Sequence, residues 1–262
     1  MCLIALAWRI HPRYRLALIA NRDEFHARPT ASADFDPDTA DVYGGRDLQA
    51  GGSWLQVSAR GRLAAVTNVR VGRTPEQAPR SRGALVSNFA RENTGAERYV
   101  ATLQVDASKY GRFNLLVHDG EALVFASNHP HFQTQAVAPG LHAMSNGAFD
   151  APWPKSGRAL DALSEWLDSP EASDFDGDAA QVAPLFEALA NTTPAPDAAL
   201  PDTGISLELE RMLSPAFLRG ERYGTRCSSV VLVDEAAIFF AELRYGPDAQ
   251  PLGQSSVRLP SA

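Results

Sequence analysis

The sequence has few cysteines, no long apolar run and no excess of positive charge. Its two cysteines, Cys2 and Cys227, are too few for a disulfide framework and suit a reducing compartment. No stretch approaches the ~18 consecutive apolar residues of a membrane-spanning helix. The apolar N-terminus lacks a basic leader and meets Arg9 too early for a secretory signal. We therefore expect a cytoplasmic protein that does not insert into membranes.

The charge and motif content excludes several classes of partner. A formal charge of −7 disfavours nucleic acid, because proteins that contact phosphate backbones are usually basic. The six histidines lack the i, i+4 helical pairing or the cysteine companions of a zinc site. No glycine-rich loop leads from a strand into a helix, as a nucleotide cofactor requires. We expect no metal and no organic cofactor; the oligomeric state stays open.

The first 24 residues predict a β-hairpin. Two short apolar stretches, residues 2–10 and 15–23, flank a breaker cluster at 11–14 that contains a proline. Pairing residue 11 with residue 14 places Cys2 opposite Asp23, and directly opposed side chains project on one face of a sheet. A one-residue change in register would bring Arg22 or Glu24 there instead.

The position of Cys2 directly after the initiator methionine suggests a nucleophile. Met followed by a small residue is the usual context for Met1 removal, which leaves Cys2 with a free α-amine. That amine has a pKa of roughly 8, so a useful fraction acts as a base near neutral pH. One residue then supplies both nucleophile and base, and Asp23 would hold the amine through a charge-assisted hydrogen bond. The alternatives are a small buried hydrophobe at Cys2 and an Asp23 that caps the following loop.

The rest of the chain predicts a mixture of strands and helices. We expect strands at 53–58, 62–68, 113–118, 121–126, 141–145, 225–233 and 237–243, and helices at 84–89, 96–103, 160–167, 182–189 and 205–213. Residues 25–43 and 70–81 look like loops, and the tail from 246 looks loosely held. The first hairpin is apolar on both faces, so both faces must be covered. This pattern fits one domain over 1–262 with two stacked sheets and outer helices.

Several motifs together resemble one family. The opening Met-Cys-Leu, the run Asn-Arg-Asp-Glu-Phe at 21–25, the glycine-containing strings at 44–47 and 51–54, and Ala-Val-Thr-Asn at 65–68 resemble the NRDE family, also called transport and Golgi organisation 2. Through the same residues the chain is similar to N-terminal nucleophile hydrolases, particularly choloylglycine hydrolases and penicillin V acylases. The resemblance implies an α+β fold, a four-layer αββα sandwich, in which Cys2 is the nucleophile.

The same resemblance suggests partners for Cys2. In choloylglycine hydrolases an Asp within an Arg-Asn-x-Asp string does the orienting, and Asn21-x-Asp23 matches the last three positions. Ala20 replaces the Arg of that string, and Arg22 occupies the variable position. Alternation along a strand places Arg22 on the face opposite Asp23. Three roles of Arg22 therefore stay open: it reaches Cys2, it braces the strand, or it binds Glu24 or Asp47. With Trp54, Asn21 and Arg22 are our candidates for substrate binding.

Three later residues complete the implied site. The resemblance places Asn68 and Asn146 where donors stabilise an oxyanion, although an Asn before Gly, like Asn146, is also an ordinary turn residue. Arg226 matches a late active-site Arg, and a cation there would favour a thiolate; an edge arginine is the alternative. Cys227 is expected in the core.

Two functions follow from this pattern. The first is a cysteine hydrolase that cleaves a linear amide or related acyl bond of a small molecule. The second is a lipid, acyl-coenzyme A or haem handling protein that uses the same pocket, with Cys2 as a pocket residue or weak thioesterase nucleophile. The family resemblance implies both.

Overall fold

The computed structural model describes residues 2–72 and 78–260, and most of them form two antiparallel sheets. The first sheet has the order β10-β1-β2-β11-β12-β13, and the second runs from β3 to β9 in sequence order. The strands are β1 (Cys2–Trp8), β2 (Leu16–Phe25), β3 (Thr30–Asp36), β4 (Thr39–Asp47), β5 (Leu55–Ser58), β6 (Arg62–Asn68), β7 (Phe113–His118), β8 (Leu123–Ser127), β9 (Gln133–Ala136), β10 (Gly140–Met144), β11 (Tyr223–Val233), β12 (Ala237–Tyr245) and β13 (Pro251–Pro260).

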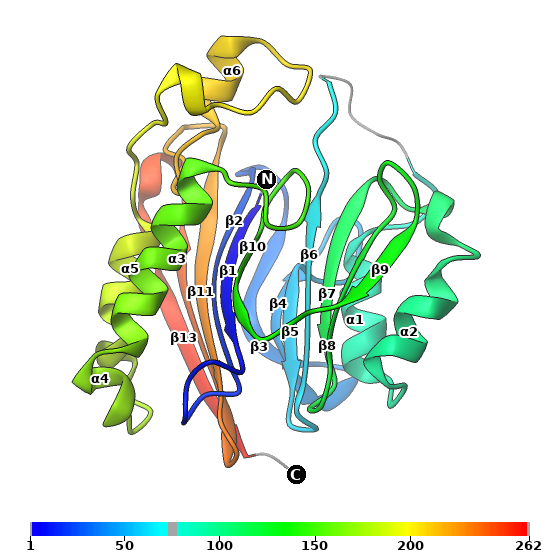
Figure 1. Cartoon of the computed structure of the whole chain (residues 1–262), viewed down its shortest axis with the longest axis vertical. Helices are drawn as coiled ribbons and strands as arrows, with labels where there is room; N and C mark the ends of the chain where they lie inside the picture. The colour runs from blue at the N-terminus through cyan, green and yellow to red at the C-terminus, as the bar shows by residue number, and fades with distance from the viewer. Residues whose placement is uncertain (1, 73–77, 261–262) are drawn as a thin grey trace.

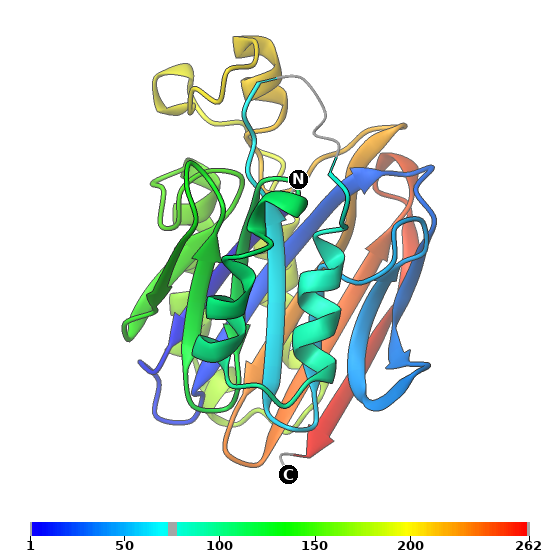
Figure 2. The same cartoon turned by 90° about the vertical axis from the view of Figure 1, so that its right-hand side faces the viewer.

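The helices form two outer layers. They are α1 (Gly83–Arg91), α2 (Ala96–Leu103), α3 (Pro154–Leu167), α4 (Pro170–Ser173), α5 (Ala183–Leu189) and α6 (Leu207–Met212). Helices α3 and α5 pack on the outer face of the first sheet, and α1 and α2 cover the second (Figure 1). The view from the side of α1 and α2 shows both helices lying across the second sheet (Figure 2). The expected αββα sandwich is therefore confirmed.

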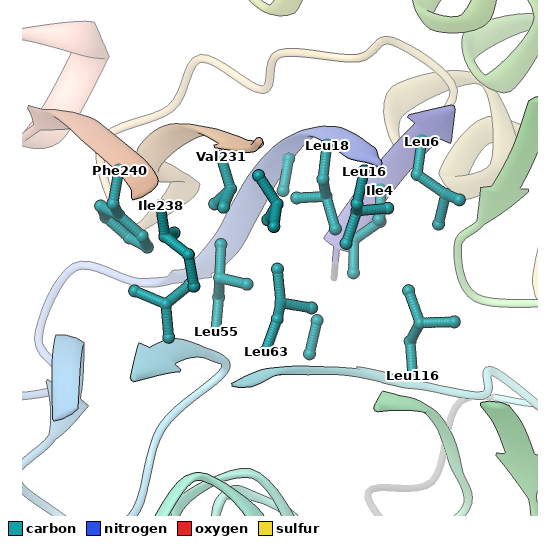
Figure 3. Packing of buried hydrophobic residues seen from close by; sticks show 14 of the residues in the cluster. Ile4, Leu6, Leu16, Leu18, Leu55, Leu63, Leu116, Val231, Ile238 and Phe240 are labelled. Carbon is teal, nitrogen blue, oxygen red and sulfur yellow. The ribbon is translucent and has the colours of Figure 1, made fainter. Parts of the chain in front are cut away.

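The two sheets face each other across an apolar layer. Along β1, Ile4 and Leu6 point into this layer, whereas Leu3 and Ala5 point toward the helices. Figure 3 shows side chains from both sheets meeting there, including Phe240. Burying one such large side chain stabilises the fold by about 1.5–3 kcal/mol. The two apolar faces of the first hairpin thus account for its place inside four layers.

The register of the first hairpin differs from our expectation by one residue. Cys2 lies opposite Arg22, not Asp23, and the last pair before the turn is Trp8 with Leu16. The turn therefore contains residues 9–15, an odd number, and Arg9 adopts a positive φ of 51°. The expected pairing assumed a tighter turn centred on 12–13. Because side chains alternate between faces, this single step changes which residue faces Cys2 across the ladder.

Two segments expected to be irregular are strands. Residues 25–43 contain β3 and the start of β4, and the tail contains β13, which pairs with β12 along most of its length. Both β3 and β13 are edge strands that are only partly covered, with most of β13 exposed, so they lack the apolar alternation that reveals a buried strand. Their ladder partners, rather than their own composition, determine their conformation. In the part of the chain described, no helix is long and apolar enough to cross a membrane.

Candidate functional site

A polar pocket of about 290 Å³ lies where β2 and β6 end. Its lining includes Arg22 and Asp23 from β2, Asn68 from β6, and Trp54 from the turn before β5. Two glycines permit the close packing beside it. A Cβ on Gly45 would lie 2.2 Å from the Trp54 ring, and one on Gly52, where φ is +79°, would lie 2.3 Å from the backbone of Gly83. Glycine at both positions therefore lets the pocket wall close.

Arg22 is directly opposite Cys2 in the β1–β2 ladder. Its guanidinium lies 4.1 Å from the centre of the Trp54 ring, a cation–π contact. Its Nη1 also donates a hydrogen bond of 3.1 Å to the hydroxyl of Thr30. Arg22 is only 6 % exposed, so these contacts hold its positive charge in place at the pocket. Trp54, expected as a substrate-binding residue, thus supports this arginine.

Asp23 is the buried acid of the pocket, with 3 % of its surface exposed. Its Oδ1 accepts a hydrogen bond of 2.6 Å from the hydroxyl of Thr225 on β11. Burial raises the pKa of this carboxyl, while the charges of Lys155 and Arg22 and the Thr225 bond partly oppose the rise. Lys155 belongs to α3 and is itself 3 % exposed. Asp23 is therefore a buried acid whose pKa stays raised, because the donors and positive charges around it only partly offset its burial.

Asn68 and Asn146 are far apart in sequence but hydrogen-bonded in the fold. Nδ2 of Asn146 donates to both the backbone oxygen and Oδ1 of Asn68, at 2.9 and 3.0 Å. This bond fixes the orientation of the Asn68 amide, and Asn68 lines the pocket. Asn146 is fully buried, and its carbonyl accepts the N–H of Arg70 at 2.9 Å. The two asparagines thus form one unit, with Asn68 nearer to the pocket.

The other two expected site residues lie elsewhere. The Asn21 amide donates to the carbonyls of Leu189 and Ala216, both at 2.8 Å, and accepts from Ser228, so it ties the helical layer to the sheet. Nη1 of Arg226 donates to the carbonyls of the β2–β3 turn, the shortest bond being 2.9 Å to Phe25. Arg226 lines a different pocket.

A larger cavity of about 610 Å³ lies on the other side of the asparagine pair. Val69 and Gly147, which follow Asn68 and Asn146 in sequence, contribute to it together with the rings of Phe149 and Trp153. The segment around α6 covers this side of the molecule through a buried ion pair of 2.7 Å between Arg70 and Glu210. The polar pocket and this more apolar cavity therefore flank the asparagines.

We also asked whether the described residues could hold a metal ion. Within residues 2–72 and 78–260, no three His, Cys, Asp or Glu side chains gather as a metal site would require. The predicted removal of Met1 lies outside the described residues. The sequence patterns did not single out Lys155 and Thr225, which lie near Asp23. The sequence contains only two lysines, and this rarity is the one feature that could have drawn attention to Lys155.

Comparison with known proteins gives this geometry a family. The model of the family described as "Transport and Golgi organisation 2" matches residues 1–245. The chain belongs to the transport and Golgi organisation 2 family. The mouse homolog is 31 % identical over 255 residues and the human homolog 32 % over 250, and each alignment covers 89 % of both chains. These relatives span nearly the whole chain, so the family membership covers both sheets.

Among solved structures, this family member resembles a conjugated bile acid hydrolase. A mutant of that enzyme from Clostridium perfringens superposes with a TM-score of 0.52 and 7 % identity, covering 98 % of this chain and 92 % of the hydrolase. At so low an identity the likeness establishes the fold alone. The transport and Golgi organisation 2 chain therefore shares the overall fold of this hydrolase.

Proposed function

We propose that this protein is a cysteine hydrolase that cleaves a linear amide or related acyl bond in a small molecule. The observation that carries the proposal is the convergence of three residues on two neighbouring strands: Cys2 begins β1 opposite Arg22 of β2, and the buried Asp23 is the next residue of β2. A strand that begins with a potential nucleophile beside a fixed cation and a buried acid suits nucleophilic catalysis.

In the proposed reaction, Cys2 attacks the carbonyl carbon after Met1 has been removed. Its α-amine takes the thiol proton and later gives it to the leaving amine, while Asp23 holds that amine in place. The C–N bond breaks, a thioester with Cys2 remains, and water hydrolyses this thioester to regenerate the thiol. The charge of Arg22 favours the thiolate over the thiol, so we assign to Arg22 the part that the family resemblance implied for Arg226.

Asn68 would donate from Nδ2 to the oxyanion, since its Oδ1 already accepts from Asn146. Asn146 then acts as a positioning residue that keeps the amide of Asn68 in this orientation. A substrate carbonyl whose oxygen accepts from Nδ2 of Asn68 would lie between the polar pocket and the larger cavity. The proposed substrate therefore carries a polar group on one side of its scissile bond and an apolar group on the other.

A panel of acyl amides and acyl thioesters tests this proposal with wild type and Cys2→Ala. We expect turnover with the wild type and none above background with Cys2→Ala, while intact mass shows a chain that lacks Met1. Cys227→Ala is the matched control, because it removes the other thiol and should leave turnover in place. Equal turnover by wild type and Cys2→Ala would refute the hydrolase.

The alternative is a protein that binds or carries an acyl compound or a haem-like ligand without turning it over. Arginines in the lining of the polar pocket favour it, because Arg82 joins Arg22 there and suits an anionic ligand. Two further lining arginines, Arg28 and Arg80, are already paired with Asp47 and Asp106. Saturable binding of an acyl thioester without product, unchanged in Cys2→Ala, would support this second function.

A further inference from the structure

Another pocket of about 260 Å³, which we call the charged pocket, lies next to the polar pocket, between β3 and the strands β11 and β12. Trp54 contributes to the lining of the polar pocket and of the charged pocket, and Thr30, which accepts the hydrogen bond from Arg22, lines the charged pocket. The proposed hydrolysis uses neither this pocket nor its charged groups. Those groups are Arg226, Glu242 and Arg244, and the thiol of Cys227 lies among them.

Glu242 supplies a hydrogen-bond acceptor that the described residues leave unused. The side chain is 1 % exposed, and its Oε1 accepts from the N–H of Ala33 at 2.9 Å, with Nη1 of Arg244 at 3.7 Å. Its Oε2 is buried and has no partner of ordinary hydrogen-bond geometry among the described residues. Burial raises the pKa of the Glu242 carboxyl, and the Ala33 bond, a hydrogen bond with the weakly donating thiol of Cys227 and the charge of Arg244 partly oppose that rise. A buried carboxyl oxygen in this state calls for a donor.

Arg226 supplies the complementary unused donor. Its Nη1 is bound to three backbone carbonyls of the β2–β3 turn, but its Nε is buried and, within the described residues, has no acceptor. Arg244 adds a second positive charge, held by bonds from Nη1 to Ser255 at 2.7 Å and from Nη2 to the carbonyl of Gln254 at 3.3 Å. The wall of the pocket thus presents one acid and two arginines with bonding capacity left over.

We propose that this pocket binds a small zwitterion of the amino-acid class, with its ammonium group on Glu242 and its carboxylate on Arg226 and Arg244. A plain cation would meet two arginines, and a plain anion would meet the glutamate, so only a ligand with both charges is matched everywhere. The site is independent of whether Cys2 acts as a nucleophile.

Calorimetric titration of the wild type tests the charge requirement. The probes are L-alanine, acetate, which lacks the ammonium group, and methylammonium, which lacks the carboxylate. We expect L-alanine to bind at least tenfold more tightly than either half-ligand. Equal affinity for acetate and L-alanine, or no L-alanine binding because water alone fills the pocket, would overturn the proposal.

The thiol of Cys227 gives a second measurement that does not depend on heat. N-ethylmaleimide labelling, followed by peptide mass spectrometry, separates modification of Cys227 from that of Cys2. L-Alanine at saturation should slow labelling of Cys227 severalfold, while the two half-ligands at the same concentration should not. Labelling of Cys227 that is unaffected by L-alanine would contradict binding in this pocket.

A charge-removing variant locates the site. Glu242→Gln keeps an acceptor for Ala33 but loses the negative charge, so L-alanine should bind at least tenfold more weakly. Glu97→Gln, which removes an exposed acid on α2, is the matched control and should bind as the wild type does. Unchanged affinity in a folded Glu242→Gln would place the ligand elsewhere. If that variant fails to fold, the half-ligand comparison in the wild type still decides.

Discussion

In the proposed reaction the buried Asp23 holds the α-amine of Cys2 in place. A carboxylate removed from water is costly unless donors and positive charges surround it, and here Thr225, Lys155 and Arg22 do so. The sequence indicated Asp23 through a hairpin register that proved wrong by one residue and through the resemblance of Asn21-x-Asp23 to a hydrolase string, but it could not reveal Lys155 or Thr225. Those two come from α3 and β11, and only the folded chain brings them to the end of β2.

Replacing Asp23 by Asn should reduce turnover by at least about 100-fold, because the α-amine loses the carboxylate that orients it. Steady-state rates on the best amide substrate measure this loss. Asp34→Asn, which alters an exposed acid on β3, should keep the wild-type rate. A fully active Asp23→Asn would contradict the assigned role.

The same variant should also change how stability depends on pH. Burial raises the pKa of Asp23, so the stability that its protonated form contributes is present below the ordinary carboxyl pKa and is lost as pH rises through the folded value. Asp23→Asn removes this loss. Urea unfolding at several pH values should therefore show the variant gaining stability relative to the wild type from acid toward neutral pH; the reverse trend would contradict a raised pKa.

Removing the side chain of Asn68 should reduce kcat by about 100- to 1,000-fold, the typical loss for one oxyanion donor. Asn146→Ala should show a smaller loss, because Asn68 keeps its donor but loses the bond that fixes its orientation. Asn93→Ala, on an exposed loop, serves as the control. A larger loss in Asn146→Ala than in Asn68→Ala would reverse the assigned order of the two.

At the scale of elements, the sequence predicted buried strands well and edge strands poorly. Strand β7 and helix α2 have the expected bounds, because apolar periodicity defines elements that are covered on one or both sides. In contrast, β3 and β13 pair mainly through their backbones, which no composition reveals. The predicted register of the first hairpin was wrong for a related reason. The width of the turn at 9–15 depends on the backbone geometry at Arg9, which the composition does not reveal.

Strand β13 should contribute measurably to stability despite its exposed surface. Leu259 is 4 % exposed and belongs to the layer between the sheets, so Leu259→Ala should lower the free energy of unfolding by about 2–4 kcal/mol. Leu252, on the same strand, is 54 % exposed, and Leu252→Ala should change it by less than about 0.5 kcal/mol. Equal urea midpoints for the two variants would mean that β13 is not held as described.

At the scale of the whole molecule, the two sheets share one apolar interior, and the first hairpin indicated this because both of its faces are apolar. The family resemblance implied that Asn68 and Asn146 share one site, but the residue pattern alone did not predict it, since the two join only when the two sheets stack. The same stacking buries His118 fully, with its ring packed edge-on against Trp8 at 5.2 Å.

His118 should make the whole fold sensitive to acid. Burial lowers the pKa of His118 to about 4, so its stability contribution is complete above the unfolded value and is lost as pH falls from about 6.5 toward 4. The loss amounts to about 3 kcal/mol over that range. His118→Leu should lose less stability between pH 7 and pH 4.5 in urea unfolding than the wild type does, whereas the exposed His131→Leu should match the wild type.

The most direct measurement is the mass of the acyl-enzyme. The protein is mixed with an activated acyl ester, quenched in acid during the first turnover and digested for peptide mass spectrometry. We expect an acyl group on an N-terminal peptide that begins at Cys2 and lacks Met1. An N-terminal peptide that keeps Met1, or an acyl group on Cys227 alone, would contradict the proposed reaction.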